Sequence, residues 1–174
     1  MVDNGINHYF RGNVPAKLKK RVSYILNAVG VCLAICLVAG FATQSSVNDW
    51  YLTLNKPSFN PPNWIFAPIW ITLYILMGIS AGIVWAKGLH HLWVKTALYH
   101  FGFQLLFNAA WSIVFFGFKE PFWALIVIVC LLILLGLTIR WFNVVSKTAA
   151  LLLLPYLIWV CFATFLNYKI WALN

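Results

Sequence analysis

Apolar stretches long enough to cross a membrane alternate with short polar segments along this chain. The pattern predicts membrane-spanning helices at about 22–43, 68–86, 93–118, 122–142 and 148–171. A transmembrane helix needs about 20 predominantly apolar residues, and each stretch is close to that length or longer. The sequence therefore predicts an all-α integral membrane protein. We expect a bundle of five transmembrane helices over 22–174, after a polar basic segment at 1–21.

The longest interruption between the predicted helices is the segment 44–67, which is rich in proline and aromatic residues. Pro61 and Pro62 favour turn or extended backbone, so we expect a loop there. Pro68 suits the first turn of the second predicted helix, where its missing N–H would have had no partner. Pro155 lies inside the fifth predicted helix and is expected to kink it.

Composition strengthens the membrane interpretation. Hydrophobic residues make up 63% of the chain and charged residues 9%, whereas charged residues are about 25% of an ordinary soluble domain. Such a chain cannot cover itself with a water-compatible surface, so lipid must be the solvent for most of it. The predicted helices use nearly all 174 residues, which leaves no room for a separate soluble domain.

The net charge is +9. The basic residues lie at the ends of the apolar stretches, where they indicate how the helices are oriented in the membrane. No basic patch interleaved with exposed aromatic residues is apparent, so we do not expect nucleic-acid binding. The positive-inside rule predicts a cytoplasmic N-terminus and a C-terminus outside. The predicted inside then holds nine basic residues: Arg11, Lys17, Lys19, Lys20, Arg21, Lys87, Lys95, Arg140 and Lys147. The outside holds three: Lys56, Lys119 and Lys169.

Groups that could perform acid–base or metal chemistry are scarce. The only acidic residues are Asp3, Asp49 and Glu120, all outside the predicted helices. His100 is the one ionisable side chain well inside a predicted helix. It is either a hydrogen-bonded structural residue or a functional group at membrane depth. No catalytic triad, phosphate-binding loop or metal-ligand pattern appears. We therefore predict no metal site.

Aromatic residues make up 18% of the chain, with ten Trp, seven Tyr and fourteen Phe. Some fall near helix ends, where they suit the membrane interface. Others form stripes at helical spacing, which indicate either helix packing or a binding site. Gln104 and Asn108 are polar and should face the bundle interior, and such groups beside aromatic faces favour a planar aromatic ligand. The stripes are Trp70–Tyr74–Met77, Gln104–Asn108–Trp111–Phe115 and Trp159–Ala163–Leu166.

Gly78 and Gly82 form a small-xxx-small motif on the second predicted helix. Such a motif permits close approach of two helices. The approach could occur between two copies of the chain or within one chain.

Three long motifs carry a resemblance to a known family. The first runs Trp50-Tyr51, Lys56-Pro57, Pro61-Pro62, Trp64, Pro68, Trp70, Tyr74, Met77-Gly78 and Trp85. The second is Gln104-Leu105, Asn108, Trp111-Ser112 and Phe115-Phe116-Gly117, and the third is Pro155-Tyr156, Trp159, Phe162-Ala163 and Leu166-Asn167-Tyr168. In order and spacing, residues 22–174 resemble the translocator protein family. This family is also called the tryptophan-rich sensory protein or peripheral-type benzodiazepine receptor family.

The resemblance implies a five-helix bundle, a homodimer, and a pocket covered by the loop after the first helix. It implies no required cofactor, but a tetrapyrrole ligand such as protoporphyrin IX or a haem-related compound. The pocket residues that it implies are Gly40, Trp64, Phe66, Ala67, Ile69, Trp70, Tyr74, Asn108, Trp111, Trp123, Trp159, Ala163 and Leu166.

The resemblance leaves three functions open. The first is a membrane receptor for tetrapyrroles and other flat hydrophobic ligands, with a sensory, scavenging or transport role. The second is light- and oxygen-dependent porphyrin degradation, for which Trp70 and Trp159 would be the reactive residues. The third is a tetrapyrrole or sterol transporter.

This sequence departs from the pattern of the animal members at two places. Their sterol motif has a basic residue a short gap after a Tyr, but here Lys169 follows Tyr168 at once and Ala172 stands at the typical basic position. Asn60 and Asn63 replace loop histidines that are common in animals. The departures argue against sterol binding and metal ligation. They favour a bacterial cell membrane over the alternative, the mitochondrial outer membrane.

Overall fold

The computed structural model describes residues 16–174, except for the side chains of residues 42 and 43. Most of the predicted basic segment 1–21, including Arg11, lies outside the described residues. Within the described part the chain is helical and contains no strand, which confirms the all-α prediction for these residues.

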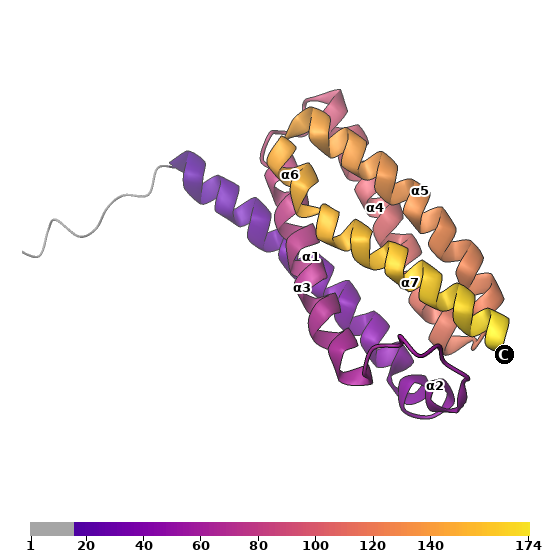
Figure 1. Ribbon diagram of the computed structural model, residues 1–174. Coiled ribbons are helices and arrows are strands. Elements are labelled where there is room, and N and C mark those ends of the chain that lie inside the picture. The colour runs from indigo at the N-terminus through magenta and orange to yellow at the C-terminus, as the bar shows by residue number, and fades with distance from the viewer. Residues whose placement is uncertain (1–15) are drawn as a thin grey trace, which may run out of the picture.

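The helices form an elongated bundle (Figure 1). Helix α1 begins well outside the bundle and then runs beside α3 (Figure 1). Helix α4 packs along α5, and α5 in turn contacts α6 and α7. In chain order the elements are α1 (Ala16–Asn48), α2 (Trp50–Thr53), α3 (Asn63–Trp85), α4 (Leu92–Ser112), the π-helix η1 (Ile113–Gly117), α5 (Pro121–Val145), α6 (Lys147–Leu152) and α7 (Leu154–Leu173).

The bundle is apolar on both its inner and its outer surface. Fully buried side chains such as Met77, Leu131 and Tyr156 fill the interior. Large apolar side chains also face outward, with Phe41 77% and Ile158 71% exposed. A contiguous apolar exterior is unusual for a protein in water and is expected of one whose solvent is lipid.

Four helical segments are long and apolar enough to cross a membrane. By length and composition these are Ala16–Phe41, Asn63–Trp85, Pro121–Val145 and Lys147–Leu173. Helix α4 is of similar length, but its polar residues, including Lys95, Gln104 and Asn108, lower its hydropathy. The observed fold therefore contains four membrane-length apolar segments where the sequence predicted five.

The two glycines of the small-xxx-small motif lie at a close helix crossing within one chain. A Cβ added to Gly78 would overlap the Cα of Val29, and one added to Gly82 would overlap the Cα of Ile25. The motif therefore brings the backbones of α1 and α3 together. This contact accounts for both glycines without a second copy of the chain.

The predicted loop 44–67 is mostly helical, so its bounds were wrong. Helix α1 continues to Asn48, the short α2 follows, and α3 begins at Asn63, which leaves 54–62 as the non-helical part. Pro68 lies inside α3 rather than at its start. A proline there removes one backbone hydrogen bond, and the rest of α3 remains helical.

Two further differences concern helix ends. The fifth predicted helix is interrupted near Pro155: α6 ends at Leu152 and α7 starts at Leu154, with Pro155 in the first turn of α7. The third predicted helix, 93–118, is α4 followed by a π-helical turn. The N–H of Phe118 donates to the carbonyl of Ile113 at 2.9 Å, five residues earlier.

Candidate functional site: an aromatic cavity

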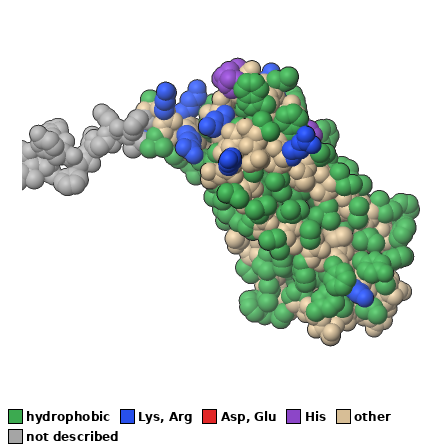
Figure 2. Space-filling model, turned by 45° about the horizontal axis from the view of Figure 1, so that its top comes forward, with side chains coloured by type: hydrophobic (Ala, Val, Ile, Leu, Met, Phe, Trp, Pro, Cys, Tyr) green, Lys and Arg blue, Asp and Glu red, His purple; other side chains and the backbone are tan. Residues whose placement is uncertain are grey.

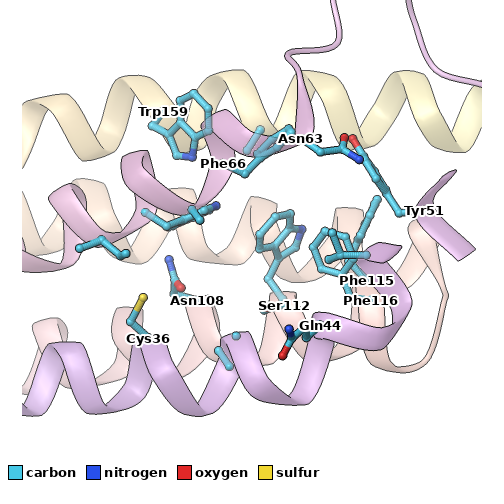
Figure 3. A pocket seen from close by; sticks show the side chains of 18 of the residues that line it. Cys36, Gln44, Tyr51, Asn63, Phe66, Asn108, Ser112, Phe115, Phe116 and Trp159 are labelled. Atoms are coloured by element: carbon cyan, nitrogen blue, oxygen red, sulfur yellow. The ribbon is translucent and has the colours of Figure 1, made fainter. Parts of the chain in front are cut away.

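A cavity of about 490 Å³ lies between α1, α3, the α4–η1 segment and α7, next to α2. Figure 3 shows Trp159 and Phe66 on the side of this cavity opposite Cys36 and Gln44. The close α1–α3 crossing at Gly78 and Gly82 lies nearer the other end of these helices. The two helices are thus in backbone contact at one end and separated by the cavity at the other.

Indole rings form the deepest wall of the cavity. The ring of Trp70 lies 5.9 Å from that of Trp111 at 35°, and 6.4 Å from that of Trp159 at 87°. Trp159 also contacts Phe66, with ring centroids 6.0 Å apart. These separations are typical of favourable aromatic pairs, so α3, α4 and α7 are joined through Trp70.

A buried hydrogen-bond chain supports this wall. The hydroxyl of Tyr74 donates to Oδ1 of Asn108 at 2.6 Å, and Nδ2 of Asn108 donates to the hydroxyl of Tyr156 at 2.6 Å. Asn108 is only 2% exposed. These two hydrogen bonds link α3, α4 and α7. Their apolar surroundings make each hydrogen bond more costly to break.

A second polar contact fixes the orientation of Trp111. Its Nε1 donates to Oδ1 of Asn167 at 3.1 Å, and Nδ2 of Asn167 donates to the carbonyl of Pro121 at 2.8 Å. Asn167 is 2% exposed. The indole of Trp111 therefore cannot turn without losing a buried hydrogen bond.

Two buried polar atoms near this network have no hydrogen-bond partner within the described part of the protein: Nε1 of Trp159 and Oε1 of Gln104. Gln104 is fully buried, and its amide nitrogen contacts only the sulfur of Met77, at 3.9 Å. Trp159 lines the cavity, whereas Gln104 does not. An unpaired buried donor costs about 1–3 kcal/mol, so Trp159 offers a donor to a ligand that brings an acceptor.

The segment from α2 to residue 62, called the covering segment below, lies at one end of the cavity. Tyr51 lines the cavity, and its hydroxyl donates to Oδ1 of Asn60 at 2.8 Å. Phe59 stacks on Phe165 of α7, with ring centroids 5.3 Å apart and 16° between the planes. Burial raises the pKa of Tyr51 to about 12, so its phenol stays neutral and keeps this hydrogen bond at physiological pH.

Asn55 and Asn174 join this covering segment to the end of α7. The N–H of Asn55 donates to Oδ1 of Asn174 at 2.9 Å, and Nδ2 of Asn174 donates to the carbonyl of Asn55 at 3.0 Å. This two-way contact holds the covering segment against α7.

The rim of the cavity is polar but uncharged. Gln44, Asn48 and Asn63 line it near α2 and are exposed, whereas Trp70 and Trp111 lie deeper. No Asp, Glu, Lys, Arg or His side chain is among the lining residues of the described chain. The cavity therefore offers a flat apolar body for a ligand and amide groups for its polar edge.

The structure brings ten of the thirteen predicted pocket residues around this cavity. They are Gly40, Phe66, Ala67, Trp70, Tyr74, Asn108, Trp111, Trp159, Ala163 and Leu166.

The other three predicted pocket residues do not line the cavity. Trp64 is 74% exposed in the first turn of α3, and Trp123 is 58% exposed on α5. Ile69 packs against the core cluster beside the cavity. Trp123 cannot reach the cavity because the walls come from other helices, and α5 contributes no lining residue.

Sequence reasoning missed most of the wall that α1, α2 and η1 form. Tyr51 and Phe116 line the cavity, as do Cys36 and Gln44 of α1. Phe115 also lines it, as the last residue of the predicted stripe Gln104–Asn108–Trp111–Phe115. From Ala28 to Phe41 every residue of α1 is apolar, so no periodic signal marked the cavity face of this part of the helix.

Helices with apolar outer surfaces around an aromatic cavity define this chain as a helical integral membrane protein. Residues 28–172 match the TspO/MBR family. The chain belongs to this family, which confirms the resemblance.

Relatives from three organisms are similar over most of their length. The chain is 43% identical over 150 residues to the tryptophan-rich protein TspO of Chlorobaculum tepidum, an alignment covering 84% of this chain and 95% of that protein. It is 42% identical over 145 residues to the human translocator protein, covering 80% and 83%. Identity to the tryptophan-rich sensory protein of Cereibacter sphaeroides is 38% over 128 residues, covering 73% and 78%.

Proposed function

We propose that the cavity binds a flat tetrapyrrole, with protoporphyrin IX as the reference ligand, and that the protein acts as a membrane receptor or scavenger for it. The observation that carries the proposal is the aromatic wall of Trp70, Trp111 and Trp159. The cavity volume of about 490 Å³ falls in the range of about 300–1,000 Å³ that is usual for small-molecule sites.

The cavity suits a ligand with an apolar ring and a polar edge. The macrocycle would lie against the indole rings, where each stacked pair contributes about 0.5–1.5 kcal/mol beyond area burial. Its carboxylate edge would reach the exposed amides of Gln44, Asn48 and Asn63. Trp159 would supply its unpaired N–H to a ligand acceptor. The name of the Cereibacter sphaeroides relative, a sensory protein, supports a role in sensing.

Titration of the purified protein in detergent with protoporphyrin IX tests binding. Following the porphyrin absorbance avoids a signal that depends on the number of tryptophans. We expect Trp70→Phe and Trp159→Phe each to weaken binding by about 2- to 12-fold, from the loss of an indole contact. Trp123→Phe is the matched control and should bind as the natural protein does. Non-saturable binding, or equal losses in all three variants, would contradict the proposal.

A second candidate function is photo-oxidative porphyrin degradation. Trp70 and Trp159 line the same cavity, with ring centroids 6.4 Å apart. A porphyrin bound there would be near two readily oxidised indoles. Illumination with oxygen should give a new absorbing product that is lost in Trp70→Phe and Trp159→Phe. Bleaching at the rate of porphyrin in empty micelles would exclude this activity.

For the membrane arrangement, we propose that α4 and η1 form a fifth span, antiparallel to α5. Gln104 and Asn108 lower the hydropathy of α4, but they are 0% and 2% exposed and face the bundle. Its outward side chains are apolar, with Tyr99 66% and Leu106 63% exposed. Lipid therefore meets an apolar surface along this helix.

We also propose a cytoplasmic N-terminus, a C-terminus outside and a bacterial cell membrane as the location. The distribution of basic residues supports the orientation. A membrane-impermeant thiol reagent should label Asn174→Cys from outside intact cells. The homodimer is proposed from the family resemblance alone, and cross-linking in native membranes would test it.

A further inference from the structure

A second hollow lies on the outer surface of the bundle, where α5 meets α6 and the start of α7. Its volume is about 430 Å³, and it shares no lining residue with the aromatic cavity. Each side presents three residues at spacing i, i+4 and i+7, one set on α5 and the other across the junction of α6 and α7. The stripe on α5 is Gly136, Arg140 and Asn143, and the facing stripe is Lys147, Leu151 and Leu154.

The groove is polar at one end and apolar at the other. Arg140, Asn143 and Lys147 lie where α5 ends and α6 begins, whereas Gly136 and Leu154 lie farther along the helices toward the middle of the bundle. A Cβ built on Gly136 meets no atom within 4 Å, so this part of the groove has free space. The polarity thus changes along the helix axes, as it does along a lipid molecule from headgroup to acyl chain.

The polar end lacks a negative partner. Arg140 and Lys147 are exposed. Asp49 and Glu120, the carboxylate side chains in the described part of the chain, follow α1 and precede α5 at the opposite end of the bundle. Figure 2 shows Lys and Arg side chains gathered at the end where α1 begins, while hydrophobic side chains cover much of the rest of this face. An anion is therefore the chemically matching occupant of the polar end.

We propose that this groove binds one anionic phospholipid from the surrounding leaflet. The guanidinium of Arg140 and the ammonium of Lys147 hold its phosphate, because guanidinium geometry matches phosphate oxygens and lysine adds a second positive charge. The amide of Asn143 donates to the headgroup. One acyl chain lies over Gly136, between Ile139 and Leu154. A free phosphate would use only the polar end and leave the apolar part empty.

Native mass spectrometry of the full chain in detergent tests this site. The probes are dioleoylphosphatidylglycerol and dioleoylphosphatidylcholine, which share acyl chains but differ in net charge. One phosphatidylglycerol should be retained in preference to phosphatidylcholine. A basic side chain near a membrane surface contributes about a fivefold preference for anionic lipid. The double variant Arg140→Gln/Lys147→Gln should therefore lose about 25-fold of the preference for phosphatidylglycerol over phosphatidylcholine.

A matched double variant, Lys87→Gln/Lys95→Gln, removes two exposed charges at the same end outside the groove and should keep the lipid. Gly136→Leu fills the apolar part without changing charge and should also release it. Inorganic phosphate at millimolar concentration should not displace the lipid. Equal loss in both charge variants, equal retention of the two lipids, retention by Gly136→Leu, or displacement by phosphate alone would each overturn the proposal.

Discussion

Replacing Gly78 and Gly82 with alanine should separate α1 from α3. The added Cβ atoms would overlap the backbone of Val29 and Ile25, and backbone cannot rotate away as a flexible side chain can. Ordinary carbon–carbon contacts are about 3.5–4.0 Å. To restore this separation, α1 has to move outward by roughly 1 Å.

The expected cost follows from overpacking. Extra methylene groups in a packed interior cost about 1–3 kcal/mol each, so the double variant should lose about 2–6 kcal/mol of unfolding free energy. Helix propensity favours alanine over glycine by about 1 kcal/mol per residue in water, so about 2 kcal/mol for the pair offsets part of this loss and leaves a net loss of up to about 4 kcal/mol. The net effect should therefore remain destabilising.

Unfolding in mixed detergent–SDS micelles, followed by circular dichroism, measures this free energy. Gly30→Ala is the matched control on α1, and Gly102→Ala is a second one on α4, because a Cβ at either position meets no atom within 4 Å. Both controls should be as stable as the natural protein or up to about 1 kcal/mol more stable, because each gains helix propensity without an overlap. Because α1 forms one cavity wall, the double variant should also bind protoporphyrin IX more weakly. Equal stability of Gly78→Ala/Gly82→Ala and the controls would refute the proposed helix contact.

Three further predictions concern the polar contacts around the cavity. Tyr156→Phe removes the acceptor of the Asn108 amide and should lower the unfolding free energy by about 1–3 kcal/mol, measured in the same micelles. Asn174→Ala removes both hydrogen bonds to the backbone of Asn55 and should speed protoporphyrin release in stopped-flow experiments, whereas Asn55→Ala keeps both backbone groups and should speed release less. Burial raises the pKa of Tyr51 to about 12 from about 10. The stabilisation by its neutral phenol is therefore complete below pH 10 and lost as the pH rises toward 12. A difference titration should show this loss in the natural protein but not in Tyr51→Phe.

The sequence was sufficient to predict the parts of the site where polar and aromatic residues share a helix face. Exposing Asn108 to hydrocarbon is costly, so this residue was expected to face inward. Trp111 follows three residues later and therefore lies on the same face of the helix. Trp70 and Tyr74, four residues apart, share a helix face in the same way. These residues indeed line one cavity.

Helix α1 shows why the remaining wall could not be predicted. One side of it faces lipid and the other faces an apolar cavity, so both sides favour the same residues. Val38 is 70% exposed, whereas the neighbouring Ala39 is 8% exposed and lines the cavity. Where lipid replaces water, hydrophobic periodicity no longer distinguishes inside from outside. The start of α3 was mispredicted for a different reason. Pro68 suggested a first helical turn, but it lies inside α3, where it removes one backbone hydrogen bond without ending the helix.

Tryptophan alone is equally ambiguous, since it suits both the membrane interface and an aromatic site. Its neighbours along the helix separate the two uses. Asn108 and Tyr74, which are buried and polar, lie one turn from Trp111 and Trp70 and share a hydrogen bond. Trp123 lies one turn from Ile126 and Val127, and it is exposed. For Trp70, Trp111 and Trp123, a buried polar neighbour one turn away thus separates the cavity side of a helix from its lipid side. Such a neighbour is not sufficient by itself, because Trp171 lies one turn from the buried Asn167 but is 42% exposed and does not line the cavity.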